Sequence, residues 1–176
     1  MLKTIIMAAG EGTRMKSSTS KVLHKLLNRE IIRYVVDASR FDDSQTIVIA
    51  GKNKSDLENL LDDVSIVEQK IGKNYPYGTG YAASLALDQI HDDDQVLVLN
   101  GDIPLITKAS LKEFVDNHIS YKNSASVLST KVLNPNGYGR IIRDDKSDFI
   151  GIVEHKDLEI NQHIINEINT GIYIFN

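Results

Sequence analysis

The sequence contains no cysteine. This absence excludes disulfides, thiolate metal sites and thiol catalysis, and it fits a reducing cytoplasm. Apolar runs are also short, because none approaches the roughly 20 residues that span a bilayer. The N-terminal segment lacks the basic flank and long apolar stretch of a signal peptide. The sequence therefore indicates a cytoplasmic protein with no membrane partner.

An excess of basic residues is missing as well, since the net charge is −4 and the pI is about 5.7. Proteins that bind duplex nucleic acid usually carry a basic face, so we expect no nucleic-acid partner. A local basic cluster could still bind a small anion. The chain has 176 residues, of which 41% are hydrophobic and 25% are charged. This composition is typical of a soluble globular domain with its own core.

Apolar, β-branched runs alternate with helical patterns along most of the chain. Strands are expected at 2–7, 46–50, 65–68, 95–100, 125–132 and 172–175. Helices are expected at 30–40, 55–61, 79–90 and 110–118, with Ser55 as the N-cap of the second. This alternation predicts an α/β fold whose mostly parallel sheet is flanked by helices.

After about residue 124 the expected strands follow one another without helices, which predicts a mixed sheet edge or a hairpin extension. No repeat, low-complexity tract or linker divides the chain. We therefore expect a single domain over residues 1–176. Because the sequence stops on a strand-like run, "EINTGIYIFN", this domain is expected to be C-terminally incomplete.

The stretch "AAGEGTR", residues 8–14, directly follows the first expected strand. Parallel sheets bind ligands beyond the carboxyl ends of their strands, and small residues leave backbone N–H groups open to a phosphate. Arg14 and Lys21 supply positive charge for phosphate oxygens. A tight turn with solvated Arg14 and Lys21 fits the pattern equally well. A dinucleotide oxidoreductase fits less well, because Met15 stands where the third glycine of its fingerprint belongs.

Asp102 follows the expected strand at 95–100 and should lie at the same sheet edge as the glycine-rich stretch. A carboxylate beside a phosphate site requires a cation, and Mg²⁺ takes few carboxylates and completes its shell with phosphate oxygens and water. Taken alone, Asp102 fits a turn or an N-cap. The acidic runs at 42–43, 62–63 and 92–94 precede strands, and we interpret them as solvated loops.

These motifs resemble a known family. "MAAGEGTRMKSSTSKVLHKL" is similar to the nucleotide-binding motif of sugar-nucleotide pyrophosphorylases. "GYGRI", "IVEHKD" and "EINTG" resemble more narrowly the bacterial bifunctional enzymes that join an N-acetylglucosamine-1-phosphate uridyltransferase to a glucosamine-1-phosphate acetyltransferase. The resemblance covers the whole chain, and it implies a Rossmann-like nucleotidyltransferase fold, the fold of nucleotide-diphospho-sugar transferases.

The resemblance also implies roles for individual residues. It assigns nucleotide binding to Met7, Ala8, Ala9, Gly10, Lys21, Gln69, Gly78 and Thr79. It assigns binding of the N-acetylglucosamine group to Gly139, Glu154 and Asn169. It assigns catalysis to Arg14, Lys21 and Asp102, with Asp102 also the ligand of a Mg²⁺ cofactor. Without the resemblance, Gly139 would be interpreted as a bulge, Glu154 as an exposed strand end and Asn169 as a turn residue.

The implied activity is Mg²⁺-dependent transfer of UMP from UTP to N-acetylglucosamine 1-phosphate, for the synthesis of cell-envelope precursors. The products are UDP-N-acetylglucosamine and pyrophosphate. Two alternatives stay open: a related nucleotidyltransferase with another nucleotide or sugar, and a fragment that binds nucleotide without turnover. In the complete family protein we expect a homotrimer, with an acetyltransferase half and a second metal-binding residue, an asparagine, beyond residue 176.

Overall fold

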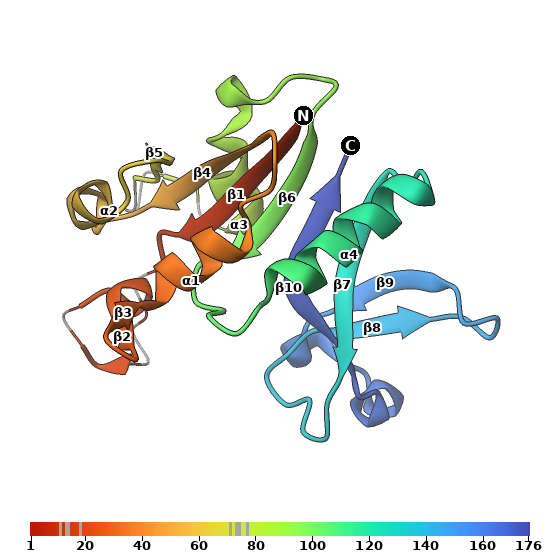
Figure 1. Ribbon diagram of the computed structural model, residues 1–176. Coiled ribbons are helices and arrows are strands. Elements are labelled where there is room, and N and C mark those ends of the chain that lie inside the picture. Colours follow the sequence, from red (N-terminus) through yellow and green to blue (C-terminus); the bar gives the residue numbers. More distant parts are fainter. Residues whose placement is uncertain (11, 13–14, 18, 71, 73–74, 77) are drawn as a thin grey trace. The chain divides into compact units, whose positions relative to one another are not determined.

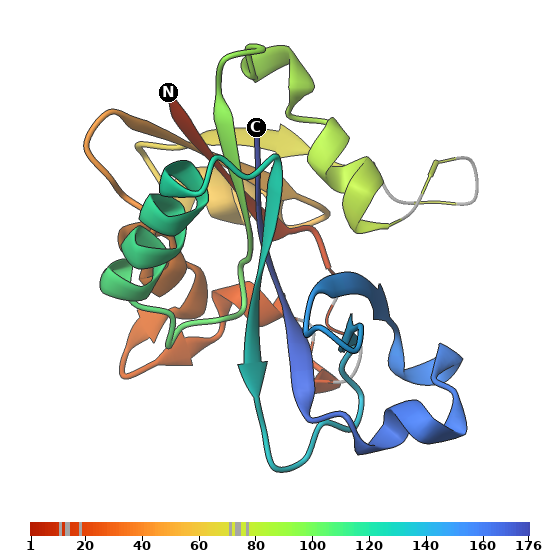
Figure 2. The same cartoon turned by 90° about the vertical axis from the view of Figure 1, so that its right-hand side faces the viewer.

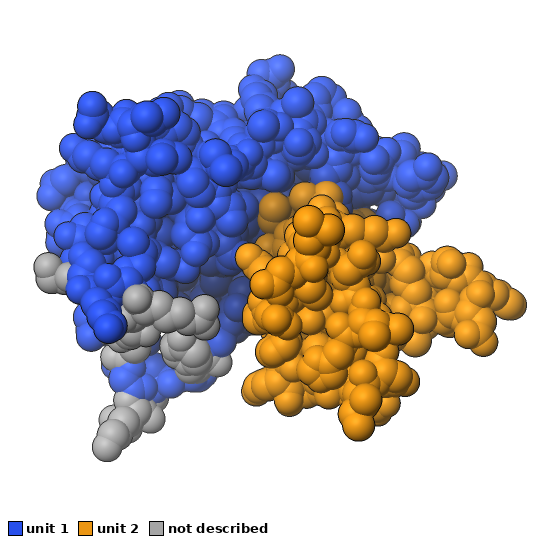
Figure 3. All heavy atoms as spheres, turned by 90° about the horizontal axis from the view of Figure 1, so that it is seen from below, with its two compact units in different colours: residues 1–125, 174–176 blue, residues 126–173 orange. Residues whose placement is uncertain are grey.

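The computed structural model covers residues 1–176 and describes all of them except residues 11, 13–14, 18, 71, 73–74 and 77. The chain divides into two compact units, coloured separately in Figure 3. Unit 1 comprises Met1–Ala125 and Ile174–Asn176, and unit 2 comprises Ser126–Tyr173. The expectation of a single domain over residues 1–176 stays a prediction.

Unit 1 is built on four parallel strands. Their order is β5 (Ser65–Glu68), β4 (Ser44–Ala50), β1 (Leu2–Ala8) and β6 (Gln95–Asn100). The predicted mostly parallel sheet is thus confirmed, and β5 and β6 have the predicted bounds. These strands read as apolar runs because helices cover both faces of such a sheet.

Strands β4, β1 and β6 end at the same level in the sheet. Met7 pairs with Ile49 of β4 and with Asn100 of β6, and Ala8 pairs with Ala50. Residues 47–50 of β4 are fully buried on both faces of the sheet, so a slip by one residue would exchange the side chains packed on the two faces and disrupt the packing of each. The loops that follow β1, β4 and β6 therefore all leave the sheet at one edge.

Four α-helices accompany this sheet: α1 (Ile31–Ala38), α2 (Lys54–Leu60), α3 (Thr79–Ser84) and α4 (Lys108–Ser120). Figures 1 and 2 show α1 and α4 on one face of the sheet and α3 on the other. Helix α1 buries Ile32, Val35 and Val36 along one side, as its apolar spacing predicts. Two short 3₁₀ turns, η2 (Lys21–Leu23) and η3 (Leu87–Gln89), complete the helical elements described in unit 1.

Several local predictions differ from the structure. Helix α2 begins at Lys54 with Asn53 before it, so Ser55 is not its N-cap. The helix expected over 79–90 ends at Ser84 and continues only as the 3₁₀ turn η3. A small hairpin, β2 (Lys25–Leu26) and β3 (Arg29–Glu30), was not expected; its turn residues Leu27 and Asn28 both have positive φ, as a type I′ turn requires.

Unit 2 contains the antiparallel part of the fold. Strand β8 (Arg140–Arg143) pairs antiparallel with β9 (Phe149–Val153) and with β10 (Glu167–Phe175), and β10 also pairs with β7 (Ala125–Lys131). Two 3₁₀ turns, η4 (His155–Asp157) and η5 (Ile160–Ile164), connect β9 to β10. The hairpin extension expected after residue 124 is therefore present as β8 and β9.

The two chain segments that lead into and out of unit 2 are joined by Asn176. Its backbone N–H donates to the carbonyl oxygen of Ser124 at 3.1 Å, and its side-chain Nδ2 donates to the carbonyl oxygen of Asn123 at 2.7 Å. Asn176 Oδ1 lies 3.0 Å from Nε2 of the buried His118 in α4. These contacts all lie in unit 1, where they hold together the chain segments that precede and follow residues 126–173.

Gly101, the first residue after β6, packs tightly against β1. Its N–H donates to the carbonyl oxygen of Met7 at 2.9 Å. A Cβ at this position would lie 3.1 Å from that oxygen and 3.3 Å from Val22 Cγ1. A side chain at this position would therefore push the ends of β1 and β6 apart by a few tenths of an ångström.

Glu167, at the start of β10, links three strands of unit 2. Its carboxylate accepts hydrogen bonds from Arg143 Nε at 2.9 Å, from Arg143 Nη2 at 2.7 Å and from Ser129 Oγ at 2.6 Å. These bonds, those from Arg143 above all, lower the pKa of Glu167 to about 2 although its partial burial acts to raise it. The carboxylate therefore stays charged well below the pH at which an exposed glutamate is protonated.

No helix among the described residues is long and apolar enough to cross a membrane.

We predict that Glu167→Gln lowers the free energy of unfolding by about 1–2 kcal/mol at pH 7, because Arg143 loses a charged acceptor on a partly exposed surface. The lowered pKa means that the carboxylate contributes its full stability above about pH 4.5 and loses it as the pH falls toward 2. Urea unfolding of both proteins at several pH values between 7 and 2 measures the difference. Glu113→Gln, on the exposed side of α4, is the control, and a difference that does not shrink at low pH would contradict the prediction.

We also predict that Gly101→Ala lowers the free energy of unfolding by about 1–3 kcal/mol, because the added methyl group overpacks the junction of β1 and β6. Thermal and urea unfolding measure this loss. Gly80→Ala is the matched control, since a Cβ there meets no atom within 4 Å and alanine favours its helix. Equal stability of the two variants would show that the junction can relax.

Candidate functional site

The glycine-rich stretch leaves the sheet at the end of β1, where Ala8 is buried and Gly10 is exposed. Backbone groups of Ala9 and Gly10 therefore approach the surface at the edge where β4 and β6 also end. Oriented backbone N–H groups at such an edge favour an anion. Arg14, a predicted catalytic residue, lies outside the described residues.

Lys21 lies along this stretch. A Cβ on Gly12 would come within 3.0 Å of Lys21 Cβ, and one on Gly10 would lie 3.7 Å from Lys21 Cε. Gly12 has a φ of +60°, which side chains rarely adopt. The glycines thus leave room for the lysine stem to lie against the loop backbone.

The ammonium group of Lys21 meets the predicted metal ligand. Lys21 Nζ lies 2.5 Å from Asp102 Oδ2, and the two side chains are 32% and 35% exposed. Asp102 follows Gly101 directly after β6, so the sequence argument placed it at the correct edge. A negative and a positive group, both reachable from solvent, therefore stand beside the exposed backbone of Gly10.

Asp102 is chemically suited to Mg²⁺, because its carboxylate is a hard oxygen ligand with access to solvent. Within the described part of the chain, no group of three or more His, Cys, Asp or Glu side chains is arranged to hold a metal. Asp102 therefore supplies a single carboxylate ligand among the described residues. It fits an ion that takes most of its ligands from phosphate oxygens and water.

Among the predicted nucleotide-binding residues, the resemblance assigns contact with the base to Gln69, Gly78 and Thr79, and Gln69 also lies at this edge. Gln69 follows β5, is 6% exposed, and donates from its N–H to the carbonyl oxygen of Ala50 at 2.7 Å. Gly78 precedes α3 with a φ of +121°, a conformation that favours glycine, and Thr79 is the exposed first residue of that helix. Their contact with a base stays a prediction.

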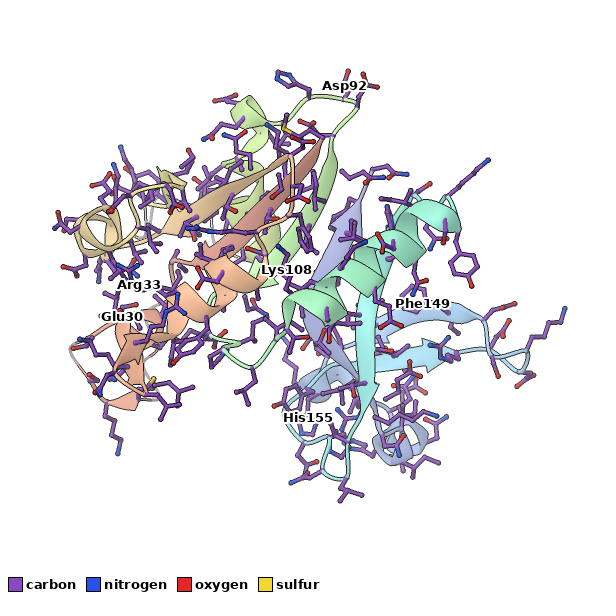
Figure 4. The ribbon with its side chains drawn as sticks, viewed as in Figure 1. Glu30, Arg33, Asp92, Lys108, Phe149 and His155 are labelled. Atoms are coloured by element: carbon purple, nitrogen blue, oxygen red, sulfur yellow. The ribbon has the colours of Figure 1, made fainter. Side chains whose placement is uncertain are left out.

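A cavity of about 590 Å³ opens beside Ala9 and Gly10. Its other walls come from Thr19, Ser20, Leu23, Glu30, Lys52, Asn53, Asp56 and Leu60. Figure 4 shows Glu30 and Arg33 close together near the start of α1, and Arg33 Nε lies 3.5 Å from Glu30 Oε2. A backbone hydrogen bond, followed by the side chain of Lys25, lowers the pKa of Glu30, so this wall carries a negative charge at neutral pH.

The residues predicted to bind the sugar come together within unit 2. A Cβ on the buried Gly139 would lie 3.0 Å from Glu154 Oε1, so glycine leaves space for that carboxylate. The N–H of Asn169 donates to the carbonyl oxygen of Gly139 at 2.9 Å. Glu154 is exposed and directly precedes His155, which Figure 4 labels. The carboxylate of Glu154 is therefore accessible to solvent beside Gly139.

The side chain of Asn169 is held by its own strand. Its Nδ2 donates to Tyr173 Oη at 2.7 Å, and its Oδ1 accepts from the N–H of Gly171 at 2.9 Å. Each atom keeps capacity for one more hydrogen bond, because an amide has two N–H donors and two lone pairs on oxygen. Asn169 can therefore be oriented by the protein and still bind a polar ligand.

The acidic run at 92–94 lies away from this edge. Asp92, labelled in Figure 4, lies in the loop before β6, at the opposite end of that strand from Asp102. The interpretation of the run as solvated is wrong for Asp94, which is 6% exposed. Asp94 pairs with the amino group of Met1 at 3.1 Å and with Lys3 at 3.8 Å, so it is a structural ion pair.

Sequence reasoning missed Asn53. It is 8% exposed at the wall of the cavity, and its Nδ2 donates to the carbonyl oxygen of Ala8 at 3.1 Å. The available signal is an asparagine two residues after Gly51, at the end of a buried strand. That pattern indicates a turn residue and does not reveal a contact 45 residues away.

Comparisons with known proteins identify the family of this chain. A protein-family model described as nucleotidyl transferase matches residues 3–176. "Bifunctional protein GlmU" of Clostridioides difficile (strain 630) is 45% identical over 99% of this chain, and GlmU of Streptococcus sanguinis (strain SK36) is 41% identical over 97%. The chain spans 38% and 37% of the length of these two curated relatives. The resemblance that the motifs indicated is thus confirmed.

Solved structures agree on the fold. The crystal structure of an apo UDP-glucose pyrophosphorylase superimposes on 100% of this chain and 77% of its own, with a TM-score of 0.76 and 18% identity. Rv0371c of Mycobacterium tuberculosis H37Rv superimposes on 72% of this chain and 63% of its own, with a TM-score of 0.59 and 21% identity. The expected nucleotidyltransferase fold is confirmed, and the chain belongs to the nucleotidyl transferase family.

Proposed function

We propose that this chain is the uridyltransferase part of a cytoplasmic protein that forms UDP-N-acetylglucosamine for cell-envelope precursors. In this proposal UTP and N-acetylglucosamine 1-phosphate are the substrates, and Mg²⁺ is the cofactor. One observation carries the proposal: the Lys21–Asp102 pair lies against a glycine-rich loop at the carboxyl edge of a parallel sheet. This arrangement suits a triphosphate and a metal ion together.

Unit 1 would bind the nucleotide. The backbone of Met7–Gly10 would hold the uridine nucleotide, and Lys21 would neutralise phosphate oxygens, together with Arg14 as the sequence predicts. Lys21 now contacts Asp102 through a partly exposed ion pair. Such pairs contribute little stability, so phosphate oxygens can take the lysine from the carboxylate at small cost.

Unit 2 would bind the sugar. Glu154 can accept hydrogen bonds from sugar hydroxyls, and the Asn169 amide can both donate and accept. Gly139 contributes by having no side chain, since a Cβ would crowd Glu154 Oε1 at 3.0 Å. The curated relatives named GlmU support an N-acetyl sugar rather than another sugar.

The proposed reaction is an in-line displacement at phosphorus. A phosphate oxygen of N-acetylglucosamine 1-phosphate attacks the α-phosphorus of UTP, the bond from that phosphorus to the bridging oxygen of the β-phosphate breaks, and pyrophosphate leaves. The attacking phosphate is already ionised at neutral pH, so no general base is needed. Catalysis then consists of positioning the two substrates and neutralising charge, chiefly by Lys21.

Asp102 would hold the Mg²⁺ cofactor, which when bound supplies further positive charge to the phosphate oxygens. The partial exposure of the Asp102 carboxylate and its place directly after β6 support this assignment. In the complete family protein an asparagine beyond residue 176 is the expected second ligand. A homotrimer is likewise proposed only for that longer protein.

We predict Mg²⁺-dependent release of pyrophosphate from UTP and N-acetylglucosamine 1-phosphate. The assay should compare this chain with one extended past residue 176, because the expected second metal ligand lies there. Other nucleoside triphosphates and glucose 1-phosphate test the alternative of a different nucleotidyltransferase, and EDTA tests the metal.

Release with another nucleotide or sugar alone would overturn the substrate assignment. UTP binding without release by either folded chain would favour the binding-only alternative.

We predict that Lys21→Met and Asp102→Asn each lower kcat by about 10²–10³-fold, with a smaller change in UTP affinity, because both groups act on charge in the transition state. Steady-state kinetics and UTP titration separate the two effects. Asp92→Asn is the matched control, since Asp92 is exposed at the other end of β6. Unchanged turnover in Asp102→Asn would remove Asp102 from the site.

A further inference from the structure

Asn53 connects the two chain segments that carry the proposed nucleotide-binding groups. We propose that Asn53 is a positioning residue for the transfer reaction, which keeps the backbone of Ala8–Gly10 and the side chain of Lys21 at a fixed distance from each other. This inference rests on the proposed function for its kinetic meaning, while its structural basis lies entirely in unit 1.

The side chain of Asn53 uses both ends of its amide. Its Nδ2 donates to the carbonyl oxygen of Ala8 at 3.1 Å and to Ser20 Oγ at 3.0 Å. Its Oδ1 accepts from the N–H of Gly51 at 2.9 Å. One buried side chain, 8% exposed, therefore joins the ends of β1 and β4 to the segment that precedes Lys21.

This orientation of the amide is the only one that the neighbours allow. If the amide were turned over, Oδ1 would face the carbonyl oxygen of Ala8, so two acceptors would meet. Nδ2 would then face the N–H of Gly51, and two donors would meet. Because each mismatch buries unsatisfied polar groups, Asn53 is held in a single orientation.

The contact with Ser20 is passed on to Lys21. Ser20 directly precedes η2, and its carbonyl oxygen accepts from the N–H of Leu23 at 2.9 Å. Ser20 thus fixes where this turn begins, and Lys21 is the first residue of the turn. A displacement of Ser20 moves the lysine stem along the glycine-rich loop and with it the ammonium group at Asp102.

Packing holds the buried Ala8 and acts less on the two residues that follow it. Ala9 and Gly10 carry almost no side chain, and the cavity of about 590 Å³ lies beside them. Hydrogen bonds therefore set the position of the loop more than van der Waals contacts do. A misplacement of about 1 Å can cost roughly 10²-fold in rate, so a residue that fixes this geometry has a kinetic effect without touching substrate.

The test is a double-mutant cycle of Asn53→Ala and Ser20→Ala, measured in whichever chain shows transfer in the assay above. We expect Asn53→Ala to lower kcat/KM by about 10–100-fold, by raising the KM for UTP and lowering kcat. Ser20→Ala should lower kcat with little change in that KM, because only the Lys21 segment is released. The two effects on kcat should be less than additive, since one hydrogen bond is shared.

Amide hydrogen exchange gives a second readout that needs no activity. In Asn53→Ala, exchange should speed up at Gly51, whose N–H loses its acceptor, and at Leu23, whose N–H donates to Ser20, and it should stay unchanged in β4. Asn117→Ala, exposed on α4, is the matched control. If no chain shows transfer, the proposed function fails, and the exchange pattern still decides whether Asn53 fixes the two segments.

Three results would overturn the inference. Asn53→Ala could keep kcat and KM within about twofold of the unmodified protein and show unchanged exchange. Its loss of activity could match the unfolded fraction, with faster exchange throughout unit 1, which would mean a purely structural role. Fully additive effects of the two substitutions on kcat would show that Asn53 does not act through Ser20.

Discussion

The in-register ending of β1, β4 and β6 is the constraint on which the rest of unit 1 depends. Because β1 pairs with a buried strand on each side, neither ladder can slip by one residue without disrupting the side-chain packing on both faces of the sheet. The chain must therefore leave the sheet three times at one level. Gly51, Gly101 and the stretch that ends in Gly10 follow these exits; Gly51 and Gly101 are buried, and Gly10 is exposed.

The same edge gathers polar groups that would not be stable together in a core. Lys21 and Asp102 satisfy each other's charge at the surface, while the buried Asn53 satisfies backbone groups just beneath it. Charge thus lies where a ligand can reach it, and uncharged hydrogen bonds lie where solvent cannot. This division explains how Asn53 can fix the backbone at this edge while Lys21 and Asp102 stay accessible to a ligand.

The sequence predicts the strands that consist of apolar runs. It does not predict features that depend on the contacts of a single side chain. Strand β6 and its junction with Asp102 follow from one buried run and a glycine. Ser55 was predicted as the N-cap of α2, but the helix follows Asn53, whose side chain bonds to Ala8, Ser20 and Gly51 and not to the first turn of the helix. The burial of Asp94 could not be foreseen either, since it depends on the partners Met1 and Lys3. Long-range pairing of this kind leaves no local pattern.

The contacts of Asn176 with Asn123 and Ser124 have a consequence for how the fold can vary. Unit 2 leaves and rejoins unit 1 at one point, so in topological terms it is an insertion with a closed base. Lengthening such a loop is inexpensive, because each doubling adds only about 0.6 kcal/mol of closure entropy. The length of the segment between Ser126 and Tyr173 can therefore vary without a change in the register of β1, β4 and β6.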